Sequence, residues 1–281
     1  MNTKIRKTDI YDAESLSWLR DIRYFVLDMD GTFYLENTIY PFSLEFLRRV
    51  ESVGKHYLFF TNNSSRCDRD YIEKLAVMDC PITPDQILTS GDVTIEYLKK
   101  YYPGKSVYLL GTPALVESFR EAGIHLTQEM PDLVVVGFDK TLDYEKLTKA
   151  CTYIRKGAVF LATHPDINCP MLDGFIPDCG AFCAAISLST GRQPRYLGKP
   201  QPETLEMVME VTGAAAEEIC FVGDRLYTDV ATGVKNGAHG VLVLSGEATL
   251  ADVETSDVKP DAIFRDLEEL GEALLNLYRQ H

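Results

Sequence analysis

The stretch RYFVLDMDGT, residues 23–32, decides the fold of this chain. Its apolar part, residues 23–27, has the length of a buried strand, and an acidic turn with a glycine follows at once. At the strand period of two, the side chains of Asp28 and Asp30 point to the same side, where they repel unless a cation or a shared proton offsets their charge. Gly31 permits a tight turn behind them. The stretch therefore predicts a strand that ends in a reactive acidic turn, with a plain capped turn as the alternative.

The same strand-then-helix pattern continues along most of the chain. Further strands are predicted at residues 56–60, 107–110, 133–136, 159–162, 219–222 and 240–244. Helical spacing predicts helices at residues 44–53, 72–77, 93–101, 113–122, 144–156, 180–190, 202–211 and 228–236. Short, continuously apolar strands between amphipathic helices are typical of α/β architecture with a mostly parallel sheet.

The composition limits the classes of protein that the chain could be. Its 281 residues are 46% hydrophobic and 25% charged, as in an ordinary globular protein, and the formal net charge is −14. That acidity argues against nucleic acid and anionic membranes as partners, since both attract faces rich in Lys and Arg. No apolar run approaches the ~20 residues of a membrane span, and none follows the basic N-terminus as in a signal peptide. Seven cysteines without a CxxC pair favour free thiols in a reducing cytoplasm, where we expect the protein.

Three further polar clusters follow or precede predicted elements, at the strand ends where function gathers in open α/β sheets. TNNS at residues 61–64 offers the Thr61 hydroxyl and backbone amides that suit an anion, although it is also a good turn and helix N-cap sequence. GKP at 198–200 holds Lys199 near a helix start, where a solvated surface lysine is the alternative. GDRLYTD at 223–229 adds Asp224 and Asp229, which suit Mg²⁺ or, for Asp229 above all, a helix N-cap.

Taken together and in this order, DMDGT, TNNS, GKP and GDRLYTD resemble the four motifs of the haloacid dehalogenase (HAD) superfamily. The stretches ATHPD at 162–166, GKPQPETL and VLVLSG resemble its NagD-like branch, subclass IIA, and the likeness covers about residues 20–250. This resemblance implies a Rossmann-like core with a parallel sheet and an inserted α/β cap domain.

The resemblance also implies a role for each matching residue. Asp28 would be the nucleophile that forms an aspartyl-phosphate, and Asp30 would be the general acid and base. The phosphoryl oxygens would be bound by Thr61, Lys199 and the amides of Asn62 and Asn63. Asp30 would also contact the substrate, at the leaving group.

Mg²⁺ would bind the Asp28 carboxylate, the Asp30 carbonyl and Asp224. Asp229 would not bind the metal directly. It would orient Lys199 or a water molecule bound to the metal.

The spacing of the motifs predicts where a second domain lies. Thr61 and Lys199 are 138 residues apart (199 − 61), whereas a simple strand–helix unit takes only ~30 residues. We therefore expect a discontinuous core at residues 1–84 and 193–281 and a cap at 85–192. The cap loops 163–168 and 171–178 are candidates for substrate choice, with His164 where the branch usually shows Asn.

The predicted function is a Mg²⁺-dependent phosphatase of small phosphate monoesters, such as a sugar phosphate, a nucleotide or a similar metabolite. A phosphomutase or phosphotransferase with the same aspartyl-phosphate is the alternative, and a non-catalytic phospho-acceptor module is a third reading. Branch members often pair through the cap, so a homodimer is a further expectation.

Overall fold

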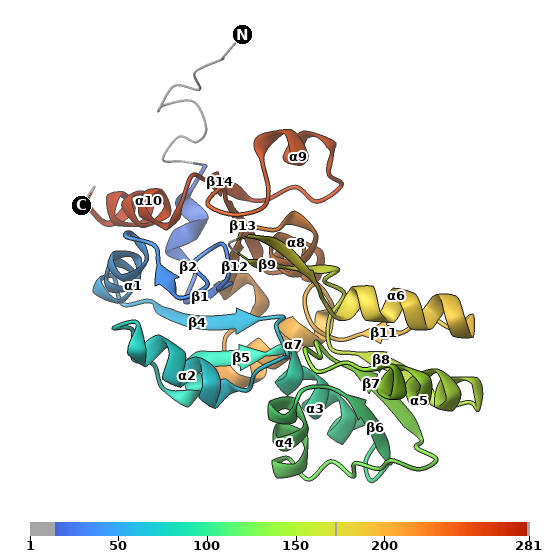
Figure 1. Ribbon diagram of the computed structural model, residues 1–281. Helices are drawn as coiled ribbons and strands as arrows, with labels where there is room; N and C mark the ends of the chain where they lie inside the picture. The colour runs from blue at the N-terminus through green and yellow to red at the C-terminus, as the bar shows by residue number, and fades with distance from the viewer. Residues whose placement is uncertain (1–14, 172, 280–281) are drawn as a thin grey trace. The chain divides into compact units, whose positions relative to one another are not determined.

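The computed structural model describes residues 15–171 and 173–279 (Figure 1). The basic stretch at residues 1–14, which bore on the signal-peptide prediction, lies outside the described residues. By its internal contacts the chain divides into two compact units, Met1–Phe59 with Val208–His281, and Phe60–Met207. The second unit is thus continuous in sequence and interrupts the first.

The first unit is built on a parallel sheet, which confirms the predicted fold class. Its strands are β1 (Tyr24–Leu27), β4 (His56–Thr61), β12 (Ile219–Gly223), β13 (His239–Val243) and β14 (Ala262–Phe264). The strand order is β14-β13-β12-β1-β4-β5, in which β5 (Ile87–Thr89) belongs by sequence to the second unit. Leu27 lies in register with Val222, so the acidic turns after β1 and β12 begin at the same edge of the sheet.

Helices cover this sheet because their apolar stripes need a surface to pack on. Helices α1 (Ser43–Ser52) and α10 (Leu267–Arg279) lie side by side, and Gly271 lets the backbone of α10 approach Phe46 and Arg49 closely (Figure 1). Helix α8 (Ala231–Asn236) packs on β12 and β13. The remaining elements are η1 (Ser17–Arg20), the hairpin β2 (Tyr34–Leu35) and β3 (Thr38–Ile39), η3 (Ala216–Glu218), the π-helix η4 (Leu226–Val230) and α9 (Leu250–Thr255).

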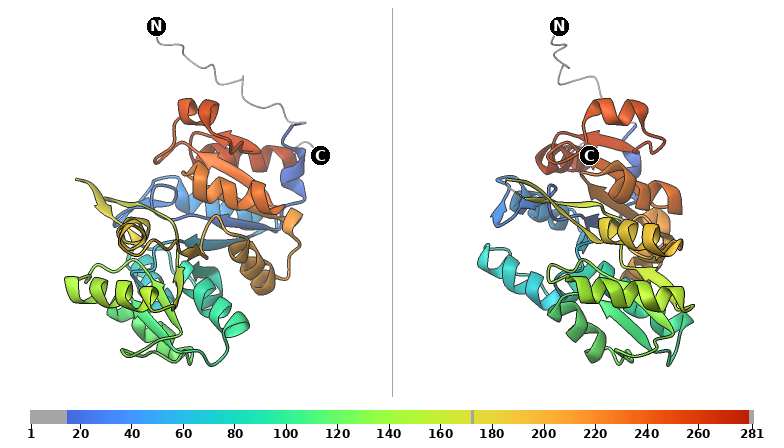
Figure 2. Two further views of the ribbon diagram at one scale, coloured as in Figure 1. Left: turned by 90° about the vertical axis from the view of Figure 1, so that its right-hand side faces the viewer. Right: turned by 45° about the vertical axis from the view of Figure 1, so that its right-hand side comes forward.

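The second unit contains a four-stranded parallel sheet of its own, in the order β11-β8-β7-β6. The strands are β6 (Val107–Leu110), β7 (Leu133–Val136), β8 (Val159–Ala162) and β11 (Arg195–Tyr196). The helices and turns are α2 (Asp68–Val77), η2 (Pro84–Gln86), α3 (Ser90–Tyr101), α4 (Pro113–Glu121), α5 (Tyr144–Arg155) and α6 (Cys179–Thr190). Helix α6 lies beside α5 (Figure 2), and a hairpin of β9 (Asn168–Met171) and β10 (Gly174–Pro177) precedes α6. Helix α7 (Pro202–Thr212) crosses the division between the units.

The predicted strands and helices are present, with two differences. The helix predicted at 228–236 starts as an α-helix only at Ala231, because residues Leu226–Val230 form a π-helix. The acidic C-terminal segment, for which no element is predicted, contains β14 and α10. Leucines 267, 270, 274 and 277 of α10 are buried at helical spacing, while its acidic residues lie on the other side.

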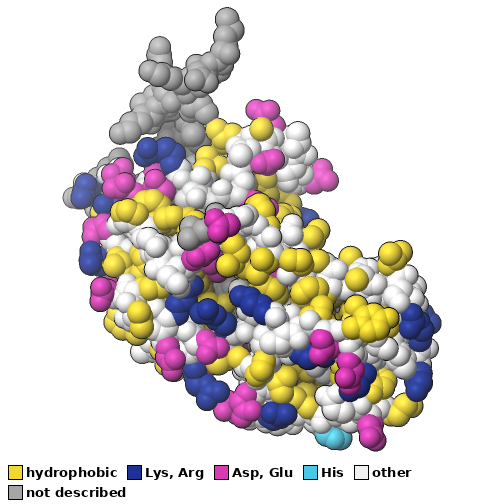
Figure 3. Space-filling model, in the orientation of Figure 1, with side chains coloured by type: hydrophobic (Ala, Val, Ile, Leu, Met, Phe, Trp, Pro, Cys, Tyr) yellow, Lys and Arg dark blue, Asp and Glu magenta, His cyan; other side chains and the backbone are white. Residues whose placement is uncertain are grey.

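Charged side chains of both signs are interspersed over the visible face of the molecule (Figure 3). Several form surface ion pairs, such as Lys99 with Glu96 at 2.7 Å and Lys105 with Asp132 at 3.0 Å. All seven cysteines are free thiols. Within residues 15–171 and 173–279, every helix is too short or too polar to cross a membrane.

Candidate active site

Three carboxylates of the first unit form a cluster at the edge of the sheet. Asp28 follows β1, Asp224 follows β12, and Asp229 lies in the π-helix η4. One carboxylate oxygen from each lies within 4.8 Å of those of the other two, and Asp224 and Asp229 are buried. We call Asp28, Asp224 and Asp229 the acid cluster. The register of β1 with β12 explains it, because neighbouring parallel strands end at the same level.

Backbone groups and glycines hold Asp224 in place. Its carboxylate accepts hydrogen bonds from the Glu247 N–H at 2.7 Å and the Thr32 hydroxyl at 3.4 Å. A Cβ atom on Gly31 would lie 2.5 Å from Asp224 Oδ2, and one on Gly246 would lie 2.0 Å from it. Both positions therefore need glycine for a close approach to this carboxylate, and Gly31 also adopts φ = +92°.

The acid cluster brings negative charges close together in a largely buried place. Burial and the adjacent Asp229 raise the pKa of Asp224, while Arg225 opposes the shift. Tyr40 of the same unit has its phenol pKa raised by burial and by the negative charges of Asp224 and Asp30. The site therefore favours a bound cation.

Asp229 is not the helix N-cap that the alternative interpretation predicts. It lies inside η4, and its Oδ2 accepts a hydrogen bond from the Arg225 N–H at 3.0 Å. A Cβ atom on Gly223 would lie 2.3 Å from the Asp229 side chain, so glycine is required there. A carboxylate oxygen of Asp229 lies within 4.8 Å of one from Asp28 and one from Asp224. Its role outside the direct ligands of a metal stays a prediction.

Asp30 stands outside this group of three. Its Oδ2 accepts a hydrogen bond from the Tyr34 hydroxyl at 3.5 Å, and its backbone forms a bridge with Tyr34. The turn is held further by Ser245, whose hydroxyl donates to the Gly31 carbonyl at 2.9 Å. Asp30 is half-buried, and its role as general acid and base stays a prediction.

A divalent cation fits the acid cluster. Mg²⁺ prefers oxygen ligands and few protein carboxylates, which leaves room for water and a phosphate oxygen. Asp28 and Asp224, with Asp229 close by, provide such oxygens, and the raised pKa of Asp224 reflects charge that a cation would neutralise.

In the second unit, residues 61–65 form a loop held by its own side chains. Thr61 Oγ1 accepts from the Asn63 N–H at 3.1 Å, and Asn63 Oδ1 accepts from the Ser65 N–H at 3.0 Å. The interpretation of this stretch as a helix cap is wrong, because α2 begins at Asp68 and its N-cap is Cys67. The binding of phosphoryl oxygens by Thr61 and the amides of Asn62 and Asn63 stays a prediction.

Lys199 is buried, so the alternative of a solvated surface lysine is wrong. Its ammonium donates to the Phe60 carbonyl at 3.2 Å. The Asn62 side chain binds the main chain of Lys199 on both sides, since its Oδ1 accepts from the Lys199 N–H at 2.9 Å and its Nδ2 donates to the Lys199 carbonyl at 3.1 Å. Sequence reasoning missed this role of the Asn62 side chain, for which an asparagine in a turn sequence gives no signal.

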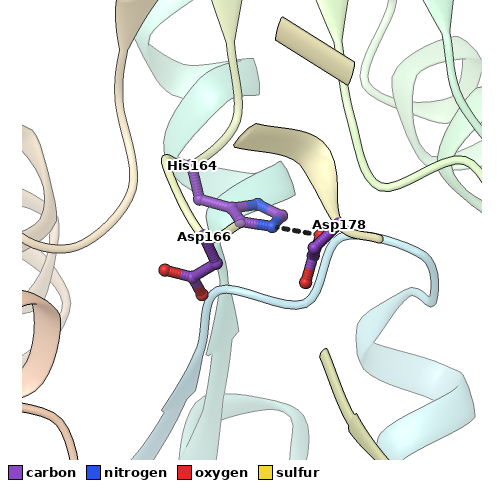
Figure 4. Close-up of side chains that lie close together, drawn as sticks. All are labelled: His164, Asp166 and Asp178. Atoms are coloured by element: carbon purple, nitrogen blue, oxygen red, sulfur yellow. Dashed lines mark hydrogen bonds and ion pairs between the residues drawn. The ribbon is translucent and has the colours of Figure 1, made fainter. Parts of the chain in front are cut away.

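A second buried polar cluster of the same unit surrounds His164 (Figure 4). His164 Nε2 lies 2.9 Å from Asp178 Oδ1, and its Nδ1 lies 2.9 Å from Thr163 Oγ1 and 3.3 Å from Ser90 Oγ. His164, Asp166 and Asp178 are all buried, and a possible ligand atom of each lies within 4.8 Å of the others. Asp178 is the N-cap of α6, which an aspartate directly before a predicted helix could have indicated. Contact between His164 and substrate stays a prediction.

The parallel sheet with carboxylates at its edge places the first unit among the Rossmann-like α/β folds. Residues 25–125 match the family model "Haloacid dehalogenase-like hydrolase", and residues 196–270 match a second HAD-hydrolase-like model. The chain is 34% identical over 252 residues to the acid sugar phosphatase of Staphylococcus aureus strain MRSA252, which covers 89% of this chain and 97% of the relative.

Two solved structures are similar throughout. The 4-nitrophenylphosphatase of Thermotoga maritima has a TM-score of 0.88 at 47% identity, over 92% of this chain and 99% of that one. NagD from E. coli K-12 has a TM-score of 0.81 at 32% identity, over 88% and 98%. The chain belongs to the haloacid dehalogenase-like hydrolases, in the NagD-like branch, subclass IIA, and is a phosphoric monoester hydrolase.

Proposed function

We propose that this phosphatase depends on Mg²⁺ and hydrolyses small phosphate monoesters through an aspartyl-phosphate on Asp28. The acid cluster carries the proposal, because it joins a half-buried carboxylate, Asp28, to two buried ones whose oxygens are suited to a divalent cation. Asp28 and Asp224, with the Asp30 carbonyl, would hold the metal. When bound there, the cation supplies positive charge that stabilises the phosphoryl oxygens.

The chain's own groups would carry the two chemical steps. An Asp28 oxygen attacks phosphorus, and the leaving alcohol takes a proton from the carboxyl group of Asp30. A water molecule then loses a proton to Asp30 and attacks the phosphorus of the aspartyl-phosphate, which releases inorganic phosphate and restores Asp28. The hydrogen bond from Tyr34 would orient the Asp30 carboxyl for both transfers.

Thr61, the Asn62 and Asn63 amides and Lys199 would bind the phosphoryl oxygens. The buried state of Lys199 supports this proposal, since a lysine removed from water is stabilised by anionic partners. Asp229 would orient groups around the metal.

The remaining parts of the proposal concern domains, partners and place. A cap at residues 85–192 would contact the leaving group, through loops 163–168 and 171–178, and exclude water from a core at 1–84 and 193–281. The protein would work in the cytoplasm, where its free thiols persist, and would form a homodimer.

A phosphate-release assay over a panel of esters tests the function. The panel contains p-nitrophenyl phosphate, sugar phosphates, nucleoside monophosphates and phosphoglycolate, each with Mg²⁺. Two relatives are called acid sugar phosphatase and 4-nitrophenylphosphatase. We therefore expect turnover of sugar phosphates and of p-nitrophenyl phosphate, with the higher kcat/KM on a sugar phosphate. A product that is an isomeric phosphate rather than inorganic phosphate would instead identify a mutase.

The Lys199→Met variant is expected to lose about 100-fold in kcat on every substrate, because it keeps the buried stem and removes the charge that stabilises the phosphoryl oxygens. Lys55→Met is a matched control. Lys55 is also a buried lysine whose ammonium donates to backbone carbonyls, those of Arg20 and Ile22, outside the proposed site. Lys55→Met should lower the melting temperature with kcat unchanged; equal kcat losses in the two variants would remove Lys199 from catalysis.

A further inference from the structure

His164 is a buried titratable residue that the steps above do not use. Its side chain has no exposed surface, and its polar neighbours come from three segments of the second unit: Ser90, the stretch with Thr163 and Asp166, and Asp178. A ring with this many polar neighbours in the interior must satisfy each of them, so the hydrogen bonds determine its protonation state.

The surroundings of the ring favour a proton on both ring nitrogens, because a carboxylate oxygen of buried Asp166 and one of buried Asp178 each lie within 4.8 Å of a ring nitrogen. The Ser90 hydroxyl donates its single proton to the Asn62 carbonyl at 2.6 Å, so toward His164 Nδ1 it can only accept. On the other side, Asp178 Oδ1 accepts the Cys179 N–H at 2.5 Å as an N-cap and faces His164 Nε2 at 2.9 Å. An ionised carboxylate accepts only, so Nε2 donates as well. The Thr163 hydroxyl, 2.9 Å from Nδ1, can accept as well, so these partners accommodate an imidazolium.

The surroundings of the ring support that state. Burial alone lowers the pKa of His164, but the charges of Asp178, Cys179 and Asp166 and the hydrogen bond to Asp178 raise it to about 9. An imidazolium also makes these three residues unsuited to a metal ion, since a protonated ring has no lone pair to give.

Two routes lead from this ring to Asn62, and from Asn62 to Lys199. Through Ser90, His164 fixes the Asn62 carbonyl. Through its charge, His164 stabilises the neighbouring Asp166. Asp166 Oδ1 accepts a hydrogen bond from Asn62 Nδ2 at 3.3 Å. This bond fixes the orientation of the Asn62 amide, so that its nitrogen faces the Lys199 carbonyl. The amide then binds the N–H and the carbonyl of Lys199.

We propose that His164 is a positioning residue, a buried imidazolium that holds Asn62, and through it the main chain of Lys199, in one arrangement. The same ring links Asp178, the N-cap residue of α6, to the segment that follows β8. It therefore also fixes the position at which the hairpin of β9 and β10 leads into α6. Its effect on turnover rests on the function proposed above for Lys199.

The protonation state can be measured without any activity. The chain has five histidines, and the ¹⁵N resonances of His164 are identified as those missing from the His164→Gln variant. In the wild type we expect both ring nitrogens of His164 to carry protons at pH 7.5 and to lose one only toward pH 9. A neutral ring at pH 7.5, or a shift of its resonances on addition of Zn²⁺ alone, would overturn the proposal.

Kinetics test the positioning role. His164→Gln cannot donate toward both Asp178 and Ser90, so kcat should fall about tenfold on p-nitrophenyl phosphate and sugar phosphates alike, with KM within about twofold. Ser90→Ala should cause a similar loss, and the double variant should lose no more than either single one, because both act through Asn62. If His164→Gln does not fold, the loss of kcat in Ser90→Ala tests the positioning role by itself.

His239→Gln is the matched control, since His239 also faces an aspartate, Asp261, at 3.4 Å in the first unit, and its kcat should not change. A loss confined to sugar phosphates would instead place His164 at the substrate, and additive losses in the double variant would separate it from Ser90; either result overturns the proposal. A wild type that releases no phosphate from any ester contradicts the proposed function itself, whatever the NMR result.

Discussion

Asp28→Asn is expected to reduce kcat for p-nitrophenyl phosphate by at least about 1000-fold, because an amide cannot replace the carboxylate that attacks phosphorus. The variant should keep its fold, since the Asp28 side chain is half-buried and an amide has the same shape. The acid cluster adds a second expectation. Removal of one of three crowded charges should raise the melting temperature of the metal-free protein.

The control for this experiment is Asp139→Asn. Asp139 is a buried carboxylate of the second unit, bound to Lys146 at 2.7 Å and to the Thr141 N–H at 2.8 Å. Its loss should lower the melting temperature and leave kcat unchanged, opposite in both respects to Asp28→Asn. Phosphate release and thermal unfolding measure the two effects. If Asp28→Asn turned over within tenfold of the wild type, another residue would have to be the nucleophile.

The parts of the site that the sequence predicted are those fixed by strand ends. Asp28 and Asp224 could be expected to lie together because each directly follows a short apolar strand, and parallel strands end at one edge. The glycines beside them are also local signals, because Gly31 needs positive φ and Gly246 meets Asp224.

The parts that the sequence did not predict depend on contacts between distant segments. Lys199 is buried by residues more than a hundred positions away, such as Phe60 and Asn62, so its neighbours in sequence favoured the wrong alternative of a solvated side chain. Asp229 seemed a good N-cap by position, but the π-helix turns it toward Arg225 and the acid cluster. His164 follows a predicted strand, yet its charge state depends on Ser90 and Asp178, which only the fold brings to it.

These contacts connect the fold to the proposed chemistry. The first unit gathers negative charge in the acid cluster, and the second unit buries Lys199 and His164, for which we propose a positive charge. Each buried cation is held by named acceptors, so neither has to be ordered when a substrate arrives. Enzymes accelerate phosphoryl transfer mainly by positioning the reacting groups and neutralising the charge on the phosphoryl oxygens, and preorganised charges serve both purposes.

Removal of divalent cations with EDTA is expected to abolish phosphate release, and Mg²⁺ added in excess should restore it fully. The reason is the acid cluster, where three carboxylates and an anionic ester cannot share one site without positive charge. Binding is measured separately from activity by thermal unfolding, because a ligand at 100 times its Kd stabilises the fold by about 2.7 kcal/mol. Mg²⁺ should therefore raise the melting temperature of the wild type.

Asp224→Asn distinguishes this site from any other that binds Mg²⁺. Asp224 is buried and is held by the Glu247 N–H, so its amide variant keeps the shape of the cluster and loses one charged ligand. We expect the Mg²⁺-induced rise in melting temperature to shrink or vanish in this variant, while Asp139→Asn keeps it in full. Undiminished phosphate release after chelation, or an unchanged Mg²⁺ response in Asp224→Asn, would show that the acid cluster does not bind the ion, and Asp28 would then need another source of charge neutralisation.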